Sequence, residues 1–328
     1  MMLNNKVLKQ IFENCHFTQA GKELTLSNYA EDAKNIYSRA PEIFKYCTPF
    51  GIAGRFLFNQ NSCPILYHYL PWRNLKMIIQ SGQFYIGHQD QMNDPWDRKY
   101  IYRIAEELLI EKGVSLVALN TFRKLSQRPI FDRYVWSFTA NNHSFAMQNY
   151  GDTAIGMDVF DMIHYLTNKN DEFYIIKKIK EAPKLPVFPI KVCYNSEIHY
   201  EYANVAIGKF IDGLRHHDYL KMMFGVEAFD FYSMIFKRKI LEEEQEYRFI
   251  ISRPKLMKES WHTWDKKVNG GNKIIGEVTA DNLKSIVINH RISENKNIQW
   301  DNAISKIQFF LKENGFLNTR VRKTVLPY

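Results

Sequence analysis

The chain has 328 residues, a length that suits one large domain or two smaller ones. Hydrophobic residues make up 45% and aromatic residues 15%, which is enough for a packed core and excludes wholesale disorder. Lysine and arginine number 44 against 35 for aspartate and glutamate. The net charge of +9 fits an anionic partner such as a nucleotide, a nucleic acid or a membrane surface, but an ordinary basic protein would also carry it.

Neither a membrane span nor a secretory signal is visible in the sequence. No window approaches the roughly 20 apolar residues that cross a bilayer. Residues 1–24 mix polar and charged side chains into their apolar positions, unlike the uninterrupted core of a signal peptide. We therefore predict a cytoplasmic protein without a membrane partner.

The cysteines give no sign of a metal site. Cys15, Cys47, Cys63 and Cys193 are far apart in the sequence, and no Cys-x-x-Cys or other zinc-like spacing occurs. Free thiols in a reducing cytosol are the simplest interpretation, so we expect no metal.

Residues 1–62 are predicted to form a helical N-terminal extension, and residues 63–328 the main domain. Apolar residues recur at helical spacing over residues 6–12 and 28–46, and Pro41 is expected to split the second stretch. The segment Gly51-Ile52-Ala53-Gly54 is expected to interrupt the chain before its character changes.

The main domain mixes strand and helix patterns without an internal repeat. The strand patterns lie at residues 64–69, 84–86, 134–139, 154–157, 188–194, 247–252, 274–279 and 283–288. The helix patterns lie at residues 71–81, 101–112, 116–125, 160–180, 203–236 and 298–313, with one or two helical turns at residues 144–150. This order predicts an α+β fold, in which helices are inserted between the strands of a mixed sheet.

His68 is the first candidate for a binding residue. It lies between two tyrosines in the first predicted strand, where a histidine is more often a hydrogen-bonded structural residue than a functional one. Its functional interpretation is as a donor to a ligand hydroxyl or phosphate, because imidazole offers two distinct nitrogens.

Hydroxyl and aromatic side chains follow one another at the end of the strand 134–139. Trp136 and Ser137 lie in that strand, and Ser144 and Tyr150 follow shortly after it. An ordinary strand end capped by hydroxyl groups explains this pattern. The alternative is a pocket wall, in which a hydroxyl binds an amide and an aromatic ring stacks on a ligand.

The third candidate is an acidic segment, Glu242-Glu243-Glu244-Gln245-Glu246, that runs directly into a strand pattern. A solvated loop accounts for most of these acids. Alternation along the strand places Glu246 and Arg248 on one face, where the arginine would hold the carboxylate ionised. A fixed anionic carboxylate suits a substrate that develops positive charge, such as an oxocarbenium sugar.

Several familiar catalytic patterns are absent. The sequence contains no Gly-x-Gly-x-x-Gly, no phosphate-binding Gly-x-x-x-x-Gly-Lys-Ser/Thr, no His-Glu-x-x-His and no Gly-x-Ser-x-Gly. Adjacent histidines, His216 and His217, would point in different directions from a helix, which makes a metal site there improbable.

Taken together, several stretches resemble a bacterial family called domain of unknown function 2971. They are residues 66–69 with 81–82, residues 92–97, residues 136–139 through 149–152, and residues 244–248, and residues 286–294 look like the C-terminal end of the family. The resemblance covers about residues 64–315 and keeps the family's order. His290 departs from it, because the family usually has proline after glycine there.

This family looks distantly similar to ADP-ribosyltransferases of the His–Tyr–Glu type. The similarity implies a split, mixed β-sheet and an NAD site to which three strand-borne positions contribute. His68 would contact the adenosine ribose, Tyr150 would stack on nicotinamide, and Ser144 would lie near its carboxamide. Glu246 would bind the 2′-hydroxyl of the nicotinamide ribose and stabilise the oxocarbenium. Glu244 completes a Glu-x-Glu pattern typical of transferases that modify arginine, although a run of four acids can produce that spacing by chance.

The sequence thus leaves two kinds of function open. The first is an NAD-dependent ADP-ribosyltransferase that uses NAD as a substrate and modifies a protein or nucleic-acid target, as a toxin or antiviral defence effector; an NAD glycohydrolase differs only in using water as acceptor. The second is a non-catalytic module that binds nucleotides or nucleic acid in a bacterial defence or stress system. The second rests on the net charge of +9 and the aromatic content.

Overall fold

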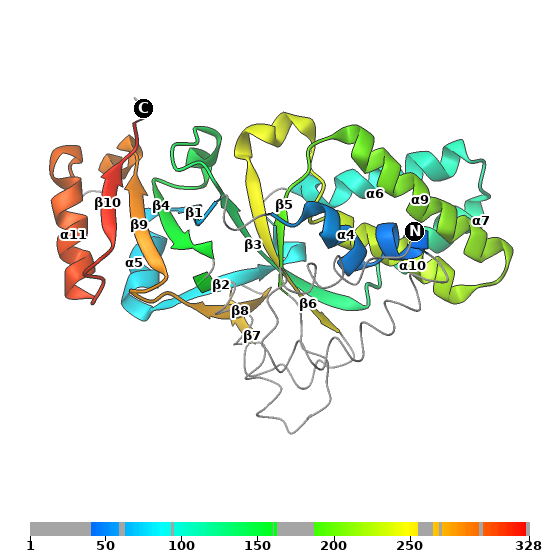
Figure 1. Cartoon of the computed structure of the whole chain (residues 1–328), viewed down its shortest axis with the longest axis horizontal. Helices are drawn as coiled ribbons and strands as arrows, with labels where there is room; N and C mark the ends of the chain where they lie inside the picture. Colours follow the sequence, from blue (N-terminus) through cyan, green and yellow to red (C-terminus); the bar gives the residue numbers. More distant parts are fainter. Residues whose placement is uncertain are drawn as a thin grey trace, which may run out of the picture.

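The structure is a computed structural model that describes residues 41–58, 63–92, 95–159, 161–162, 187–254, 265–268, 271–294 and 298–325. Within these residues ten strands join one mixed sheet, with helices grouped on both sides of it (Figure 1). This confirms the predicted α+β fold class. The predicted helices at residues 6–12 and 160–180 lie wholly or largely outside the described residues.

The sheet is built around one long strand. Its order is β10-β9-β4-β1-β3-β2-β8-β7, and β6 and β5 add to β3 on its other side. The strands are β1 (Ile65–Leu70), β2 (Gln83–His88), β3 (Phe131–Thr139), β4 (Thr153–Asp158), β5 (Val187–Lys191), β6 (Glu246–Pro254), β7 (Asp265–Val268), β8 (Gly271–Glu277), β9 (Leu283–Ile288) and β10 (Arg320–Lys323).

The sheet is split beside β3. β6 pairs with β3 over its full length, from Phe131 opposite Pro254 to Thr139 opposite Glu246. On the other edge of β3, β1 pairs at Thr139 alone, whereas β2 pairs only at Val135 and Tyr134. The edge of β3 between these contacts therefore faces a gap between β1 and β2.

Two hydrophobic cores lie on opposite faces of β3. Val135 belongs to the core under the helices on the right of Figure 1, and Trp136 and Phe138 belong to the core on the other face. The alternation follows from the two-residue period of a strand. The helices of the first core are α3 (Pro41–Cys47), α4 (Pro49–Phe56), α6 (Pro95–Glu111), α7 (Leu116–Ser126), α9 (Ser196–Arg215) and α10 (Tyr219–Tyr232), and those of the second are α5 (Trp72–Ser81) and α11 (Ala303–Glu313).

Short 3-10 helices complete the described chain: η2 (Gln89–Gln91), η3 (Ala146–Tyr150), η4 (Lys239–Glu244), η6 (His290–Glu294) and η7 (Trp300–Asn302). Most predicted elements of the main domain are present within a few residues. The helix pattern at residues 203–236 is two helices, because His217 takes a positive φ of 54° and Asp218 caps α10. No helix among the described residues combines the length and apolarity that crossing a membrane requires.

The prediction that Gly51 and Gly54 interrupt the chain is wrong. Both lie inside α4, which Thr48 caps by accepting a hydrogen bond from the Gly51 backbone nitrogen. A Cβ on Gly51 would lie 1.9 Å from the Phe44 carbonyl oxygen, so the glycine permits a close approach of α3 to α4. The rings of Tyr46 and Tyr202, 4.8 Å apart, join α3 to α9. The described end of the predicted extension thus packs into the helical core.

A buried ion network ties the sheet to these helices. Arg133 on β3 is 1% exposed and pairs with Asp230 on α10, which is 2% exposed. Gln89 donates a hydrogen bond of 2.9 Å to Asp230, and Arg98 on α6 lies 3.8 Å from the same carboxylate. A buried charge needs its partner, because an unpaired ion is costly in the interior.

We expect Asp230→Asn to lower the free energy of unfolding by about 3–5 kcal/mol, because Arg133 would remain buried without its main counterion. Urea denaturation followed by circular dichroism measures this. The matched control is Asp212→Asn, which removes an exposed partner of Lys221 and should leave the urea midpoint nearly unchanged. Equal midpoint shifts for the two variants would contradict the assignment.

Candidate functional site

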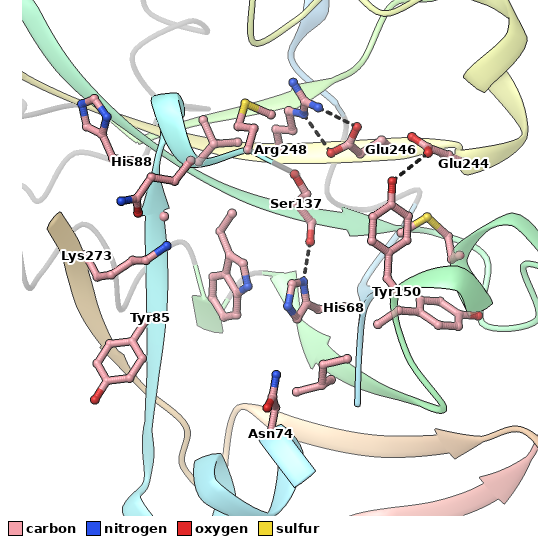
Figure 2. Close-up of a pocket in the computed structure, with 18 of the residues that line it drawn as sticks. His68, Asn74, Tyr85, His88, Ser137, Tyr150, Glu244, Glu246, Arg248 and Lys273 are labelled. Carbon is pink, nitrogen blue, oxygen red and sulfur yellow. Dashed lines mark hydrogen bonds and ion pairs between the residues drawn. The ribbon is translucent and has the colours of Figure 1, made fainter. Parts of the chain in front are cut away.

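A cavity of about 300 Å³ opens where the sheet splits between β1 and β2. Its lining comes from β1, β2, β3, β6 and β8 and from the helices α5, η2, η3 and η4, so it gathers residues from distant parts of the chain (Figure 2). Its polar and aromatic lining residues are His68, Tyr69, Asn74, Tyr85, His88, Gln91, Trp136, Ser137, Tyr150, Lys237, Glu244, Glu246, Arg248 and Lys273.

Most of the predicted site residues line this one cavity: His68, Trp136, Ser137, Tyr150, Glu244, Glu246 and Arg248. Ser144 is the exception. It is 3% exposed, and its hydroxyl accepts a hydrogen bond from the backbone nitrogen of Met147 in η3. Its own backbone nitrogen donates to the Tyr69 hydroxyl. Ser144 therefore positions the turn that carries Tyr150, and its predicted position beside a ligand carboxamide is corrected.

Glu246 is held by a salt bridge to its strand neighbour. Arg248 Nε donates to Oε1 at 2.8 Å and Nη2 donates to Oε2 at 2.9 Å, and Lys237 Nζ donates to Oε2 at 3.1 Å. Burial raises the pKa of Glu246, but Arg248 and Lys237 overcome this effect and lower the pKa to about 2, with a further contribution from a hydrogen bond to the Ser137 side chain. The carboxylate is 5% exposed and ionised at neutral pH, as the alternation with Arg248 predicted.

Glu244 joins the same cluster through a turn. Gln245 takes a left-handed conformation with φ 45°, which ends η4 and returns the chain into β6. Lys237 Nζ lies 2.6 Å from Glu244 Oε2 and so bridges the two carboxylates. Glu244 is 7% exposed, unlike the exposed Glu242 and Glu243. Only part of the acidic run is therefore solvated.

Tyr150 is attached to this cluster by its hydroxyl, which donates to Glu244 Oε1 at 3.0 Å. Burial and the neighbouring Glu244 raise the pKa of the phenol, so it stays protonated and keeps this hydrogen bond. It lies on the helical turn η3, as predicted, rather than on a strand. Figure 2 shows its ring beside the acidic pair at one end of the cavity.

His68 lies in the middle of the cavity and its protonation follows from its contacts (Figure 2). Nδ1 lies 2.8 Å from the Ser137 carbonyl oxygen, which can only accept, so Nδ1 carries the proton. Burial lowers the pKa of His68, so the ring is neutral and Nε2 is an acceptor. The prediction of His68 as a donor to a ligand is thereby corrected: the available nitrogen can accept a hydroxyl proton.

His68 packs against a cluster of aromatic rings, in which only Phe84 and Trp136 are stacked face to face. Trp136 is 4% exposed and lies against Phe84, with ring centroids 3.8 Å apart. The His68 ring lies 6.0 Å from Trp136 and 5.6 Å from Phe138. Trp136 therefore fixes the wall behind His68 more than it offers a free stacking face to a ligand.

The opposite end of the cavity carries a lysine, Lys273 on β8 (Figure 2). It faces Gly87 on β2, and a Cβ at Gly87 would lie 3.3 Å from Lys273 Nζ. Burial lowers the pKa of this lysine, and among the side chains that the structure describes, which do not include those of β7, no carboxylate pairs with it. Such a partly desolvated ammonium favours an anionic ligand.

Sequence reasoning missed Lys237 and Lys273. Lys237 is 3% exposed, although it belongs to a short basic run that resembles ordinary surface charge. Its position a few residues before four acids was a usable signal, because opposite charges close in sequence can pair. Lys273 borders a strand pattern at residues 274–279, and nothing local distinguishes it from a surface lysine.

The described residues contain no group of three or more histidine, cysteine, aspartate or glutamate side chains arranged to hold a metal ion. Comparison with known proteins found no matching family model, no matching curated protein and no matching solved structure. The resemblance to ADP-ribosyltransferases accordingly stays a prediction.

The depressed pKa of Glu246 makes stability depend on pH. Because this pKa lies below the ordinary 4.5, the ionised carboxylate stabilises the folded state above about pH 4.5, and this stabilisation is lost as the pH falls towards 2. At pH 7 it amounts to about 3 kcal/mol. We therefore expect the difference in urea midpoint between wild type and Glu246→Gln to be large at pH 7 and to shrink below pH 4.5.

Urea titrations at pH 7, 5, 4 and 3 measure this difference. Glu243→Gln is the matched control, since it changes an exposed acid of the same run and should follow the wild type at every pH. A midpoint difference that stays constant from pH 7 to 3 would show that Glu246 is not the titrating group.

Proposed function

We propose that this protein binds NAD in the cavity between β1 and β2 and cleaves its nicotinamide–ribose bond, transferring the ADP-ribosyl group to a protein or nucleic-acid acceptor. The observation that supports the proposal is the meeting of His68, Tyr150 and Glu246 at one cavity, although 178 residues separate the first from the last.

The proposed chemistry uses the fixed negative charge. The bond between C1′ of the ribose and the nicotinamide nitrogen breaks, its electron pair neutralises the pyridinium, and an oxocarbenium ion is left. Glu246, with its pKa near 2, is anionic and buried, and a preorganised carboxylate in a low-dielectric site stabilises positive charge that develops beside it. The acceptor nucleophile then bonds to C1′ and loses its proton.

Binding would use the rest of the cavity. Tyr150 offers an aromatic ring beside Glu244 and Glu246, and His68 offers Nε2 as an acceptor for a ribose hydroxyl. Lys273, at the far end, suits the pyrophosphate, because its partly buried ammonium group can donate to phosphate oxygens.

One contact has to change for a ribose hydroxyl to reach Glu246. A carboxylate offers about four acceptor positions. Arg248 uses two of them, and Lys237 and the Ser137 side chain use the others. Lys237 has the longer contact, at 3.1 Å, and keeps its bond of 2.6 Å to Glu244 if it leaves Glu246. A ligand hydroxyl can therefore replace Lys237 without leaving the ammonium unpaired.

Because protein side chains already use the acceptor positions of Glu246, the structure also favours a second candidate function, a non-catalytic nucleotide-binding module. If Glu246 serves only to neutralise Arg248 and Lys237 inside the protein, the cavity keeps its aromatic and cationic groups for binding but provides no carboxylate for catalysis. NAD binding without nicotinamide release would favour this function over the first.

We expect Glu246→Gln to reduce nicotinamide release from NAD by at least about 100-fold, because the amide cannot stabilise the oxocarbenium as a carboxylate does. Chromatography of nicotinamide released by the pure full-length protein, with candidate protein and nucleic-acid acceptors present, provides the measurement. Glu243→Gln is the matched control and should retain the wild-type rate. The enzyme function fails if wild type and Glu246→Gln release equal, background amounts.

We also expect Lys273→Gln to raise the Kd for NAD by about tenfold, since one charge-assisted hydrogen bond to the pyrophosphate is lost. Isothermal titration calorimetry measures the Kd, and nicotinamide mononucleotide, which lacks the pyrophosphate, serves as the comparison ligand. The control is Lys284→Gln on β9, outside the cavity lining. An unchanged Kd for NAD in Lys273→Gln would contradict this position for the pyrophosphate.

A further inference from the structure

A second cavity of about 340 Å³ lies in the helical region beside the first cavity. One face of α6 supplies Trp96, Tyr100, Arg103 and Glu107, which recur at helical spacing. The buried Ile104 of α6, Tyr200 on the neighbouring α9 and Arg238 complete its walls. We refer to these seven residues as the α6 groove.

The α6 groove presents aromatic rings to solvent. Trp96 is 47% exposed and Tyr200 is 43% exposed, whereas many of the described aromatic residues pack in the two cores. Tyr100 forms part of the wall, where its hydroxyl group lies 3.0 Å from His199 Nδ1. Exposed ring faces can stack on unpaired bases, whose own faces are accessible only in a single strand.

Polar groups accompany these rings. The Arg238 guanidinium lies over the Trp96 ring, 5.7 Å from its centroid, so a cation and an aromatic face already form one platform. Arg103 Nε donates to Glu107 at 2.8 Å, and the Tyr200 hydroxyl donates to the other oxygen of that carboxylate at 3.3 Å. Guanidinium groups suit phosphate, and a carboxylate can accept from the amino group of a base.

The α6 groove and the first cavity meet at consecutive residues. Lys237 lines the first cavity and Arg238 lines the groove. Their Cα atoms are therefore about 3.8 Å apart, the length of one peptide unit. A nucleic-acid strand lying in the groove would pass the end of the first cavity that holds Glu244 and Glu246, where Lys237 bridges the two carboxylates.

We propose that the α6 groove binds single-stranded nucleic acid, with a base stacked on Trp96 or Tyr200 and the phosphate backbone near Arg238. The net charge of +9 supports an anionic polymer as the ligand. A role of the bound nucleic acid as acceptor of the ADP-ribosyl group rests on the function proposed above. The binding of nucleic acid to the groove does not depend on that function.

Fluorescence anisotropy of 5′-labelled 12-nucleotide single strands, in DNA and RNA versions of mixed sequence, tests the site with the full-length protein at 50 and 200 mM NaCl. We expect wild type to bind a single strand more tightly than the matched duplex, with a Kd that rises with salt. Trp96→Ala with Tyr200→Ala should raise this Kd by at least about tenfold. Tyr200→Ala alone should raise it less, and it tests the site even if loss of Trp96 disturbs the start of α6.

The matched control is Tyr219→Ala, which removes an aromatic side chain that is 59% exposed at the start of α10, outside the groove. It should retain the wild-type Kd. The proposal is overturned if wild type binds no single strand, or if the groove and control variants bind equally well.

Nicotinamide release with water as acceptor separates this proposal from the proposed function. The groove variants should release nicotinamide at the wild-type rate, because none of their changed residues lines the first cavity. If nicotinamide is released but no single-stranded nucleic acid binds, the groove proposal is overturned and the enzyme function is retained. Strand binding that depends on Trp96 and Tyr200, without release in any variant, rejects the enzyme function and retains the groove.

Discussion

Two carboxylates and two cations lie buried together at the start of β6. They can remain in the interior because they neutralise one another, and the shape of the cavity depends on this. Glu244 and Glu246 are each less than 10% exposed, and Lys237 and Arg248 are less than 4% exposed. None of these charges would be tolerated alone in the interior. Because Lys237 bridges both acids, the loop that precedes β6, the strand itself and Tyr150 on η3 are held together.

The split sheet gives this cluster its access to solvent. β6 covers one edge of β3 completely, so Arg248 and Glu246 lie opposite Ser137 and Thr139 in register. The other edge is only partly covered, by β1 at one end and β2 at the other. His68 occupies this opening by bonding the Ser137 carbonyl, a backbone group that does not pair with a strand on that edge. The gap in the sheet is therefore a cavity lined by side chains, in which His68 bonds a backbone carbonyl at the open edge of β3.

Charge is distributed unevenly along that cavity. One end holds the acidic pair with its two cations, and the other holds Lys273, whose pKa burial lowers. The proposed function would place the pyrophosphate of NAD at the Lys273 end and its nicotinamide ribose beside Glu246. The α6 groove adjoins the end that holds Glu244 and Glu246, because Lys237 and Arg238 are consecutive residues. A nucleic-acid strand in the groove would therefore lie near the nicotinamide–ribose bond that breaks in the proposed reaction.

The amino-acid sequence by itself determined the local features of this protein. The two-residue period of a strand was enough to place Glu246 and Arg248 on one face, and Gly82, with φ 65°, ends α5 where the predicted helix pattern at residues 71–81 stops. The α+β class also followed from the order of strand and helix patterns. Such features depend on neighbours within a few residues, so the periodicity of the chain records them.

Only the tertiary structure decided which distant residues share a site and which acids are buried. Lys273 and the α6 groove acquire their roles from segments that meet only in the folded chain, and no local pattern encodes these meetings. Ser144 illustrates the converse: its hydroxyl group was expected beside a ligand, but it accepts a local hydrogen bond from the Met147 backbone nitrogen. The pKa of Glu246 likewise depends on the folded chain, because burial, which raises it, and Arg248 and Lys237, which lower it, act together only once these segments meet.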